Sequence, residues 1–220
     1  MLKTFATSEP LITFQHSTLF TRMKQIIVNI SGLGFHLPGE NIDTDRIIPA
    51  RFLRCVTFEG LGENAFKDDR TAAKGEHPFD QEKNKGRPIL LVDKSFGCGS
   101  SREHAVPAIA ENGVKAIIGL SFAEIFIGNA TGNGVACVTL TELSDHEALR
   151  KACENDLPID VNLETLRITI LDGSGNPFMI IPCTMPEAYR QKLTTGNWDD
   201  ITICMEAELQ IEKVVEVLHY

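Results

Sequence analysis

The chain has 220 residues, of which 43% are hydrophobic and 23% are charged, and this composition excludes disordered, collagen-like and fibrous proteins. Lys and Arg number 21 against 30 Asp and Glu, a formal net charge of −9, which argues against a sequence-independent nucleic-acid binder. The length suits one α/β or α+β domain, and no apolar run approaches the roughly 20 residues that cross a bilayer. We therefore expect neither nucleic acid nor a membrane among the partners.

The six cysteines stand at positions 55, 98, 137, 153, 183 and 204. No pair has the C-x-x-C spacing, and no histidine stands at the distance from a cysteine that zinc sites require. We therefore expect this chain alone to bind no metal ion and no iron–sulfur cluster. Four cysteines have apolar or helical neighbours and are expected to be small buried residues of a cytoplasmic protein. They are Cys137, Cys153, Cys183 and Cys204.

Residues 1–22 precede the first strand-like run and carry seven Ser or Thr but only one acid, Glu9. They lack the continuous apolar core of a secretory signal. Either they form a weak organellar transit peptide, or Met23 is the biological start and the strand-like residues 25–30 follow it directly. We favour the second interpretation, which predicts an N-terminal extension over residues 1–22 and a single domain over residues 23–220.

The first part of this domain is predicted to hold short strands and long loops. Residues 26–30 and 46–48 have strand-like composition, and the turn-rich residues 37–45 indicate a surface loop between them. Residues 57–87 are rich in Gly, Pro, Asn and charged side chains and have little periodicity. They are predicted to form a long, partly mobile excursion.

The centre of the chain is predicted to alternate strands and helices. Strand-like residues 88–92, 114–118 and 134–140 are separated by the helix-like residues 100–112 and 122–127. This order indicates a βαβαβ unit with parallel strands.

The last third is predicted to add a helix, a hairpin and a helical tail. Ser144 and Glu147 have the spacing of a capping box at a helix start. Residues 161–171 alternate apolar and polar side chains, and residues 178–181 return after a turn as a partner strand. The tail from residue 186 is mostly helical. The fold class is therefore α/β, with a mainly parallel sheet, a C-terminal β-hairpin and helices.

The loop after the first central strand carries the strongest chemical signal. Gly97 and Gly99 let a ligand approach the backbone closely. Ser100 and Glu103 have capping-box spacing, so the first N–H groups of the predicted helix would face an anion. Arg102 adds a guanidinium suited to a carboxylate. Because ligands of open α/β sheets bind at this edge, the residues alone predict a carboxylate or phosphate site.

Other known loop motifs do not fit these residues. Arg102 occupies the third glycine position of G-x-G-x-x-G, and neither G-x-x-x-x-G-K-[ST] nor G-x-S-x-G is present. Cys98 lies near the predicted helix start, but the sequence assigns no histidine to it. The alternative interpretation is structural: Ser100 only caps a helix, Arg102 only forms a surface ion pair, and His104 is only a hydrogen-bonded helical histidine.

Four motifs resemble one family. The segment Phe96-Gly-Cys-Gly-Ser-Ser-Arg-Glu-His-Ala105 is similar to the signature of the swivelling domain of the aconitase superfamily, and above all to the small subunits of 3-isopropylmalate dehydratase. The segment Asn41-Ile-Asp-Thr-Asp-Arg-Ile-Ile-Pro-Ala-Arg-Phe-Leu53 resembles the N-terminal loop of those subunits. Residues 116–126 with Asn133 and Gly134, and residues 199–201, agree with two further motifs.

The resemblance implies a swivelling β/β/α domain that pairs with a large subunit, which holds a [4Fe–4S] cluster. The family's reaction isomerises 2-isopropylmalate and 3-isopropylmalate in leucine biosynthesis by dehydration and rehydration of this dicarboxylate substrate. By resemblance Ser100 is the general base, Ser101 offers a backbone donor, and Arg102 grips a substrate carboxylate. The loop backbone that carries them consists of Gly97, Cys98 and Gly99.

The segment Asn41–Leu53, which comes first in the chain and is called the first motif below, adds further implied roles. Asp45, with Thr44 beside it, resembles an aspartate that supports a histidine on the opposite wall of the site. Phe52 and Leu53 would form an apolar pocket for an isopropyl group, and Arg51 belongs to the same substrate-facing segment. Without the family, turn capping explains Asp45 and a solvated surface explains Arg51.

One position departs from the family: Gly132 stands where a lysine is common, so a cation near the cleft is missing. Two alternative functions stay open. One is the small subunit of a related dehydratase for another substituted malate, of the citramalate or dimethylmalate type. The other is a stand-alone dicarboxylate-binding domain, which would bind its ligand without a large subunit.

Overall fold

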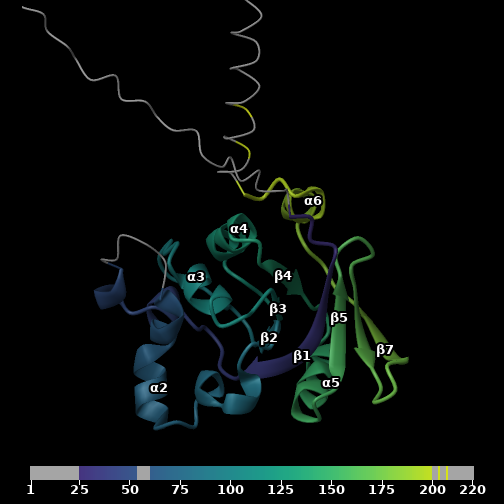
Figure 1. The fold of residues 1–220 in the computed structure, drawn as a ribbon, viewed down its shortest axis with the longest axis horizontal. Helices are drawn as coiled ribbons and strands as arrows, with labels where there is room; N and C mark the ends of the chain where they lie inside the picture. The colour runs from purple at the N-terminus through teal and green to yellow at the C-terminus, as the bar shows by residue number, and fades with distance from the viewer. Residues whose placement is uncertain (1–24, 54–59, 200–202, 204–206, 208–220) are drawn as a thin grey trace, which may run out of the picture.

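The structure is a computed structural model of the chain, and it describes residues 25–53, 60–199, 203 and 207. Within these ranges one seven-stranded sheet carries helices on its outside (Figure 1). Two expectations fall outside the described residues: the N-terminal extension over residues 1–22 and the burial of Cys204.

The sheet has the strand order β4-β3-β2-β1-β5-β6-β7. Its parallel strands are β1 (Asn29–Leu37), β2 (Ile89–Val92), β3 (Ala116–Gly119) and β4 (Ala136–Thr139). Its antiparallel strands are β5 (Pro158–Asn162), β6 (Arg167–Leu171) and β7 (Pro177–Pro182). Strand β1 joins the two halves, because its residues 29–33 pair with β5 and its residues 34–37 pair with β2.

The longer helices connect and cover these strands. They are α2 (Lys67–Ala73), α3 (Ala105–Ala110), α4 (Glu124–Gly132), α5 (Leu143–Glu154) and α6 (Glu187–Thr195). The short ones are α1 (Thr44–Ile47) and the 3₁₀ helices Ala50–Phe52, Leu61–Asn64, Pro78–Asp80 and Glu82–Asn84. The order β2-α3-β3-α4-β4 with parallel strands confirms the predicted βαβαβ unit.

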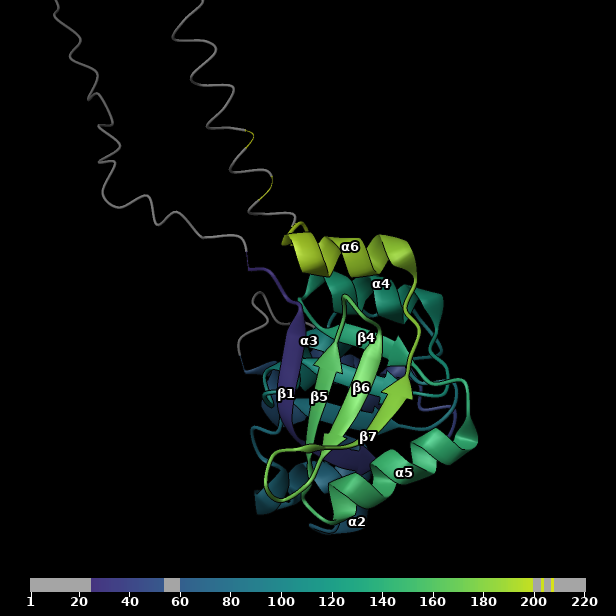
Figure 2. The same ribbon diagram turned by 90° about the vertical axis from the view of Figure 1, so that its right-hand side faces the viewer.

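The two faces of the parallel strands pack into different cores, because neighbouring residues of a strand point to opposite sides. Leu90 and Val92 belong to a core shared with α3 and α4. Ile89 and Leu91 belong to a core shared with α5 and the antiparallel strands, which cross in front of the parallel strands in Figure 2. The helices α3 and α4, the parallel strands and the antiparallel strands thus form three successive layers, although the strands belong to one continuous sheet. These layers confirm the predicted β/β/α fold.

The prediction of a first strand over residues 26–30 was wrong, because β1 starts later and ends at Leu37. Gly32 and Gly34 interrupt its apolar pattern in the sequence. Packing explains Gly34, since a Cβ there would lie 2.9 Å from Sγ of Cys153 on α5. The strand therefore carries glycine where a helix packs closest to it, which hides the strand signal.

The predicted strand over residues 46–48 was also wrong, because helix α1 occupies most of it. The side chain of Asp43 accepts a hydrogen bond of 2.8 Å from the backbone N–H of Arg46. This is an N-cap, and N-caps of Asp stabilise the first turn of a helix. Side-chain capping thus decides a short segment whose composition favours a strand.

The described part of the predicted excursion, residues 60–87, is organised by buried aromatic side chains. Phe66 and Phe79 are buried, with ring centroids 4.7 Å apart. Arg70 and Asp80 form an ion pair of 2.7 Å beside them. The segment is polar in composition but has enough apolar anchors to pack against the core.

Two details downstream were wrong. Helix α5 has Glu142 at its N-cap and no side-chain cap, so Ser144 lies inside the first turn and forms no capping box. Residues 161–171 are not one strand, because the chain turns between β5 and β6. In that turn Oδ1 of Asn162 accepts a hydrogen bond of 2.7 Å from the N–H of Thr165. The predicted hairpin itself is present as β6 and β7.

Candidate active site

Two of the four motifs, residues 41–53 and residues 96–105, lie side by side at the carboxyl ends of β1 and β2. These strands are parallel neighbours, so the loops that follow them leave the same edge of the sheet. The N–H of Gly97 donates to the carbonyl of Ile42 at 2.8 Å, and the N–H of Thr44 donates to the carbonyl of Cys98 at 2.9 Å. The loop of the first motif and the serine loop, residues 94–104, therefore form one surface.

Glycine shapes the serine loop. Gly97 and Gly99 have φ of +73° and +99°, values that side chains with a Cβ rarely adopt. A Cβ at Gly97 would also lie 2.3 Å from the ring of Phe126 on α4. At Gly99 the nearest atom, Cβ of Asp43, would be 3.4 Å away. In the structure, the groups that come close to these two glycines are Phe126 of α4 and Asp43 of the first motif.

The predicted helix start at residue 100 was wrong. Helix α3 starts at Ala105, and Ser100 and Glu103 form no capping box. After the left-handed Gly99, the N–H of Arg102 donates to the carbonyl of Ser100 at 2.7 Å, and the N–H of Ala105 donates to the carbonyl of Arg102 at 3.2 Å. Because of these turns, helix α3 begins five residues after Ser100. Support for an anion at Ser100 must therefore come from side chains rather than from the N-terminus of a helix.

The hydroxyl of Ser100 lies beside two side chains. Nε of Arg102 donates to it at 3.0 Å. Oγ1 of Thr44 lies 3.4 Å from it and donates to the Ser100 carbonyl at 2.9 Å. Ser100 is exposed, whereas Thr44 is buried. A guanidinium next to a hydroxyl favours its deprotonated form, so the arrangement suits a serine that exchanges a proton with a ligand.

Asp45 and Arg102 form an ion pair through Nε of Arg102. Asp45 is 59% exposed and Arg102 is 20% exposed. Both of these side-chain contacts of Arg102 use Nε. Ser101, next to Arg102, is exposed. The structure thus brings Thr44, Asp45, Ser100 and Arg102 together.

The predicted substrate-facing residues Arg51, Phe52 and Leu53 have contacts of their own. Arg51 donates to the carboxylate of Asp68 on α2 at 2.5 and 2.9 Å, and its guanidinium lies 4.6 Å from the ring centroid of Phe52. Phe52 and Leu53 are partly buried against the core. The substrate role of Arg51, Phe52 and Leu53 stays a prediction.

Gly132, the departure from the family, is the last residue of α4. A Cβ there would meet nothing within 4 Å. Phe126 of the same helix touches Gly97, so Gly132 lies roughly 9 Å farther along the helix at about 1.5 Å per residue. The position is therefore open to a Cβ atom.

Three predicted buried cysteines are confirmed: Cys137, Cys153 and Cys183. Burial raises the pKa of the Cys153 thiol to about 12 and that of Cys183 to about 11. Cys98 is partly exposed in the serine loop. The one group of three potential metal ligands found among the described residues contains no cysteine.

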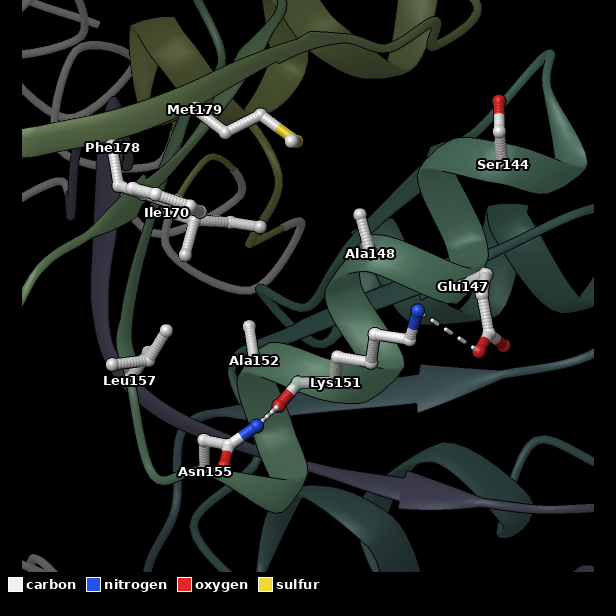
Figure 3. Close-up of a pocket in the computed structure, with 10 residues that line it drawn as sticks. All are labelled: Ser144, Glu147, Ala148, Lys151, Ala152, Asn155, Leu157, Ile170, Phe178 and Met179. Atoms are coloured by element: carbon white, nitrogen blue, oxygen red, sulfur yellow. Dashed lines mark hydrogen bonds and ion pairs between the residues drawn. The ribbon is translucent and has the colours of Figure 1, made fainter.

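A pocket away from the serine loop lies between α5 and the antiparallel strands, as Figure 3 shows. It has a volume of about 420 Å³ and a mostly apolar lining that includes Ala152, Ile170 and Phe178. Lys151 and Glu147 lie 3.8 Å apart at its helical side. No residue of the serine loop lines it, so the predicted site is a surface formed by the loops and not this cavity.

Comparison with known proteins gives a consistent result. The profile of the family "Aconitase C-terminal domain" matches residues 24–143. The 3-isopropylmalate dehydratase small subunit of Synechocystis sp. is 44% identical over 88% of this chain and 94% of its own length. That of Thermus thermophilus is 42% identical over 87% of this chain and 94% of its own length.

The fold has a solved counterpart. The crystal structure of 3-isopropylmalate dehydratase from Methanocaldococcus jannaschii superposes with a TM-score of 0.62 at 26% identity, over 84% of this chain and 98% of that chain. Among the described residues, no helix is both long and apolar enough to span a membrane.

Proposed function

Because this chain belongs to the aconitase C-terminal domain family and to its 3-isopropylmalate dehydratase small subunits, we propose that it is the small subunit of such a dehydratase. The enzyme is a hydro-lyase that isomerises 2-isopropylmalate and 3-isopropylmalate by dehydration and rehydration, a step of leucine biosynthesis. The observation that carries the role of this chain is the exposed Ser100 hydroxyl, 3.0 Å from Nε of Arg102.

The proposal includes a large subunit as partner. The name of the relatives, small subunit, implies a heteromeric enzyme. The described cysteines of this chain do not suit a [4Fe–4S] cluster, so the cluster that the family implies belongs to the large subunit. There it supplies a Lewis acid for the substrate hydroxyl. The exposed serine loop is the surface that would close over the substrate from this side.

Ser100 acts as the general base in this proposal. Its oxygen removes the proton from the substrate carbon next to a carboxylate, the carbon–oxygen bond to the hydroxyl breaks, and an alkene forms. The hydroxyl leaves as hydroxide. In the rehydration, hydroxide adds to the carbon that lost the proton, and Ser100 returns its proton to the carbon that lost the hydroxyl. A serine oxygen is a weak base in water, so it needs a nearby cation to stabilise its anion. Arg102 Nε at 3.0 Å supplies that cation.

Arg102 has a second role, which is to bind a substrate carboxylate. Its Nε is used by Ser100 and Asp45, and the terminal nitrogens of a guanidinium form a fork that matches the two oxygens of a carboxylate. Asp45 fixes the orientation of this fork, while Thr44 holds the Ser100 backbone. The backbone N–H of Ser101 is a further donor beside them.

The test is isomerase activity of the chain co-expressed with a large subunit under anaerobic conditions. Ser100→Ala should lower kcat by about two to four orders of magnitude, the usual effect of a positioned proton-transfer group. Ser144→Ala, an exposed serine on α5, is the matched control and should keep wild-type turnover. A Ser100→Ala enzyme with more than about a tenth of wild-type kcat would contradict the general-base role.

The substrate is tested in the same assembly. Isopropylmalate should turn over faster than citramalate or dimethylmalate, because Phe52 and Leu53 offer apolar surface to an alkyl group. A preference for another diacid would favour the related dehydratase, and Gly132→Lys would then show whether the missing cation sets that preference. Dicarboxylate binding by the chain without a large subunit would favour the binding-domain interpretation.

A further inference from the structure

Three side chains that are far apart in the sequence meet beside the second core. His36 lies near the end of β1, Asp93 directly follows β2, and His146 lies on α5. Nε2 of His36 is 2.9 Å from Oδ1 of Asp93, and Nε2 of His146 is 3.2 Å from the same oxygen. One potential ligand atom from each residue lies within 4.8 Å of the other two.

We propose that His36, Asp93 and His146 form a binding site for a divalent transition-metal ion of the Zn²⁺ type. Two imidazole nitrogens and one carboxylate oxygen are a donor set that Zn²⁺ accepts and that Mg²⁺ and Ca²⁺ do not favour. At metal–ligand distances of about 2.0–2.2 Å, tetrahedral ligands stand about 3.3–3.6 Å apart. The two nitrogen–oxygen distances, 2.9 and 3.2 Å, are shorter, so the ligand atoms would separate by a few tenths of an ångström to bind the ion.

The carboxylate of Asp93 is held by the backbone as well. The N–H of Gly39 donates to its Oδ2 at 2.7 Å, which leaves Oδ1 directed at the two histidines. Contacts of this kind orient metal ligands in known sites.

The surroundings suit a site with limited access. The side chains of His36, Asp93 and His146 are 17%, 21% and 7% exposed. The carbonyl oxygen of Val92 lies 3.0 Å from Nε2 of His146 and is a fourth polar atom at the same place. A metal here would tie β1, β2 and α5 together directly before Lys94, where the serine loop begins.

The competing interpretation is a hydrogen-bonded cluster without a metal, in which Nε2–H of His146 donates to Val92 and both imidazoles bond to Asp93. The two interpretations differ in metal affinity. A metal site binds one equivalent of Zn²⁺, because the ion replaces the protons shared between these atoms. A hydrogen-bonded cluster gains nothing from the ion.

The experiment uses the full chain, freed of metal and with its cysteines blocked by a thiol reagent, so that thiolates cannot bind the probe. Zn²⁺ is titrated against a chromophoric chelator, and Co²⁺ is added in a second titration to record its d–d spectrum. One equivalent of each should bind, the cobalt spectrum should lack a thiolate charge-transfer band, and Zn²⁺ should raise Tm. Mg²⁺ should neither bind with one equivalent nor raise Tm.

The variants His146→Gln and Asp93→Asn should each weaken Zn²⁺ binding by more than about 100-fold, since loss of a ligand should exceed the about 10- to 100-fold effect of losing an outer partner. His77→Asn removes a buried histidine elsewhere and should keep wild-type affinity. Circular dichroism checks that each variant folds, and His36→Gln replaces any variant that does not. Absence of Zn²⁺ binding in the wild type, or equal affinity in the folded ligand variants, would overturn the proposal.

Discussion

Nε of Arg102 donates a hydrogen bond of 3.0 Å to the hydroxyl of Ser100. The same nitrogen is ion-paired with Asp45 from the first motif. The cation beside the serine is thus paired with a residue of helix α1, so the proposed chemistry would depend on both sequence segments. The contact also predicts that changes at Arg102 and at Asp45 affect the reaction by different amounts.

Arg102→Lys is expected to lower kcat/KM by about 10- to 100-fold, because hydrogen bonds to a charged group contribute about 1.5–3 kcal/mol each. Lysine keeps the charge but has no fork, so it cannot hold a carboxylate with two parallel hydrogen bonds. Most of the effect should appear in KM. Steady-state kinetics of the assembled enzyme measure this, and an unchanged KM would show that Arg102 does not bind the substrate.

Asp45→Asn is expected to have a much smaller effect. Asp45 is 59% exposed, and exposed ion pairs contribute about 0.2–1 kcal/mol. We therefore expect kcat to fall by no more than about five-fold and thermal stability to stay close to that of the wild type. Kinetics of Asp45→Asn beside Arg102→Lys test the order. A larger loss for Asp45→Asn would show that Asp45 supports a group beyond Arg102, as the family resemblance implies.

The location of the site follows from the sequence because it depends on strand order. A run of apolar residues followed by Gly97, Gly99 and Ser100 predicts a loop at the carboxyl end of a parallel strand, and the structure places it there. The helix start could not be predicted the same way. Ser100 and Glu103 fit a capping box, but the left-handed Gly99 sends the chain through turns until Ala105.

The cluster of His36, Asp93 and His146 was missed for a different reason. Metal motifs in sequences depend on short spacing, such as C-x-x-C, whereas these residues come from β1, the end of β2 and α5. Only tertiary packing brings them together. Asp93 itself gave a usable signal, because a carboxylate directly after a buried parallel strand lies at the edge where functional groups gather.

Gly97→Ala is expected to destabilise the protein by about 2–5 kcal/mol. Alanine at φ of +73° costs about 1–2 kcal/mol, and its Cβ would lie 2.3 Å from the Phe126 ring, which adds the cost of overpacking, about 1–3 kcal/mol. Chemical denaturation measures the difference in unfolding free energy. A Gly97→Ala protein as stable as the wild type would show that the loop adopts another conformation.

Gly132→Ala is the matched control for that change. Gly132 lies in α4 and a Cβ there meets nothing within 4 Å. Alanine has a higher helix propensity than glycine by up to about 1 kcal/mol, so Gly132→Ala should leave stability unchanged or raise it slightly. The opposite signs expected at the two glycines separate a requirement for glycine from a general effect of adding a methyl group.

Stability should fall below neutral pH because of His77. Burial, together with the nearby charges of Arg70 and Arg46, lowers the pKa of His77 by more than the carboxylates of Asp69 and Asp80 raise it. Its Nδ1 accepts a hydrogen bond of 3.2 Å from the N–H of Phe79, and its ring packs against Phe66. The folded state therefore favours the neutral ring. Since the unfolded chain binds the proton with a pKa of about 6.5, the stabilisation is present above that pH and is lost as the pH falls below it.

His77→Asn tests this dependence, because an asparagine oxygen can accept the Phe79 N–H but does not titrate. The variant should be less stable than the wild type near pH 7.5, where it lacks the packing of the imidazole ring against Phe66. Between about pH 7.5 and 5.5, on either side of the unfolded histidine pKa, its Tm should fall less than that of the wild type. Thermal unfolding at several pH values measures both differences. Equal pH dependence in the two proteins would assign the acid sensitivity to another group, since only the loss of His77 distinguishes them.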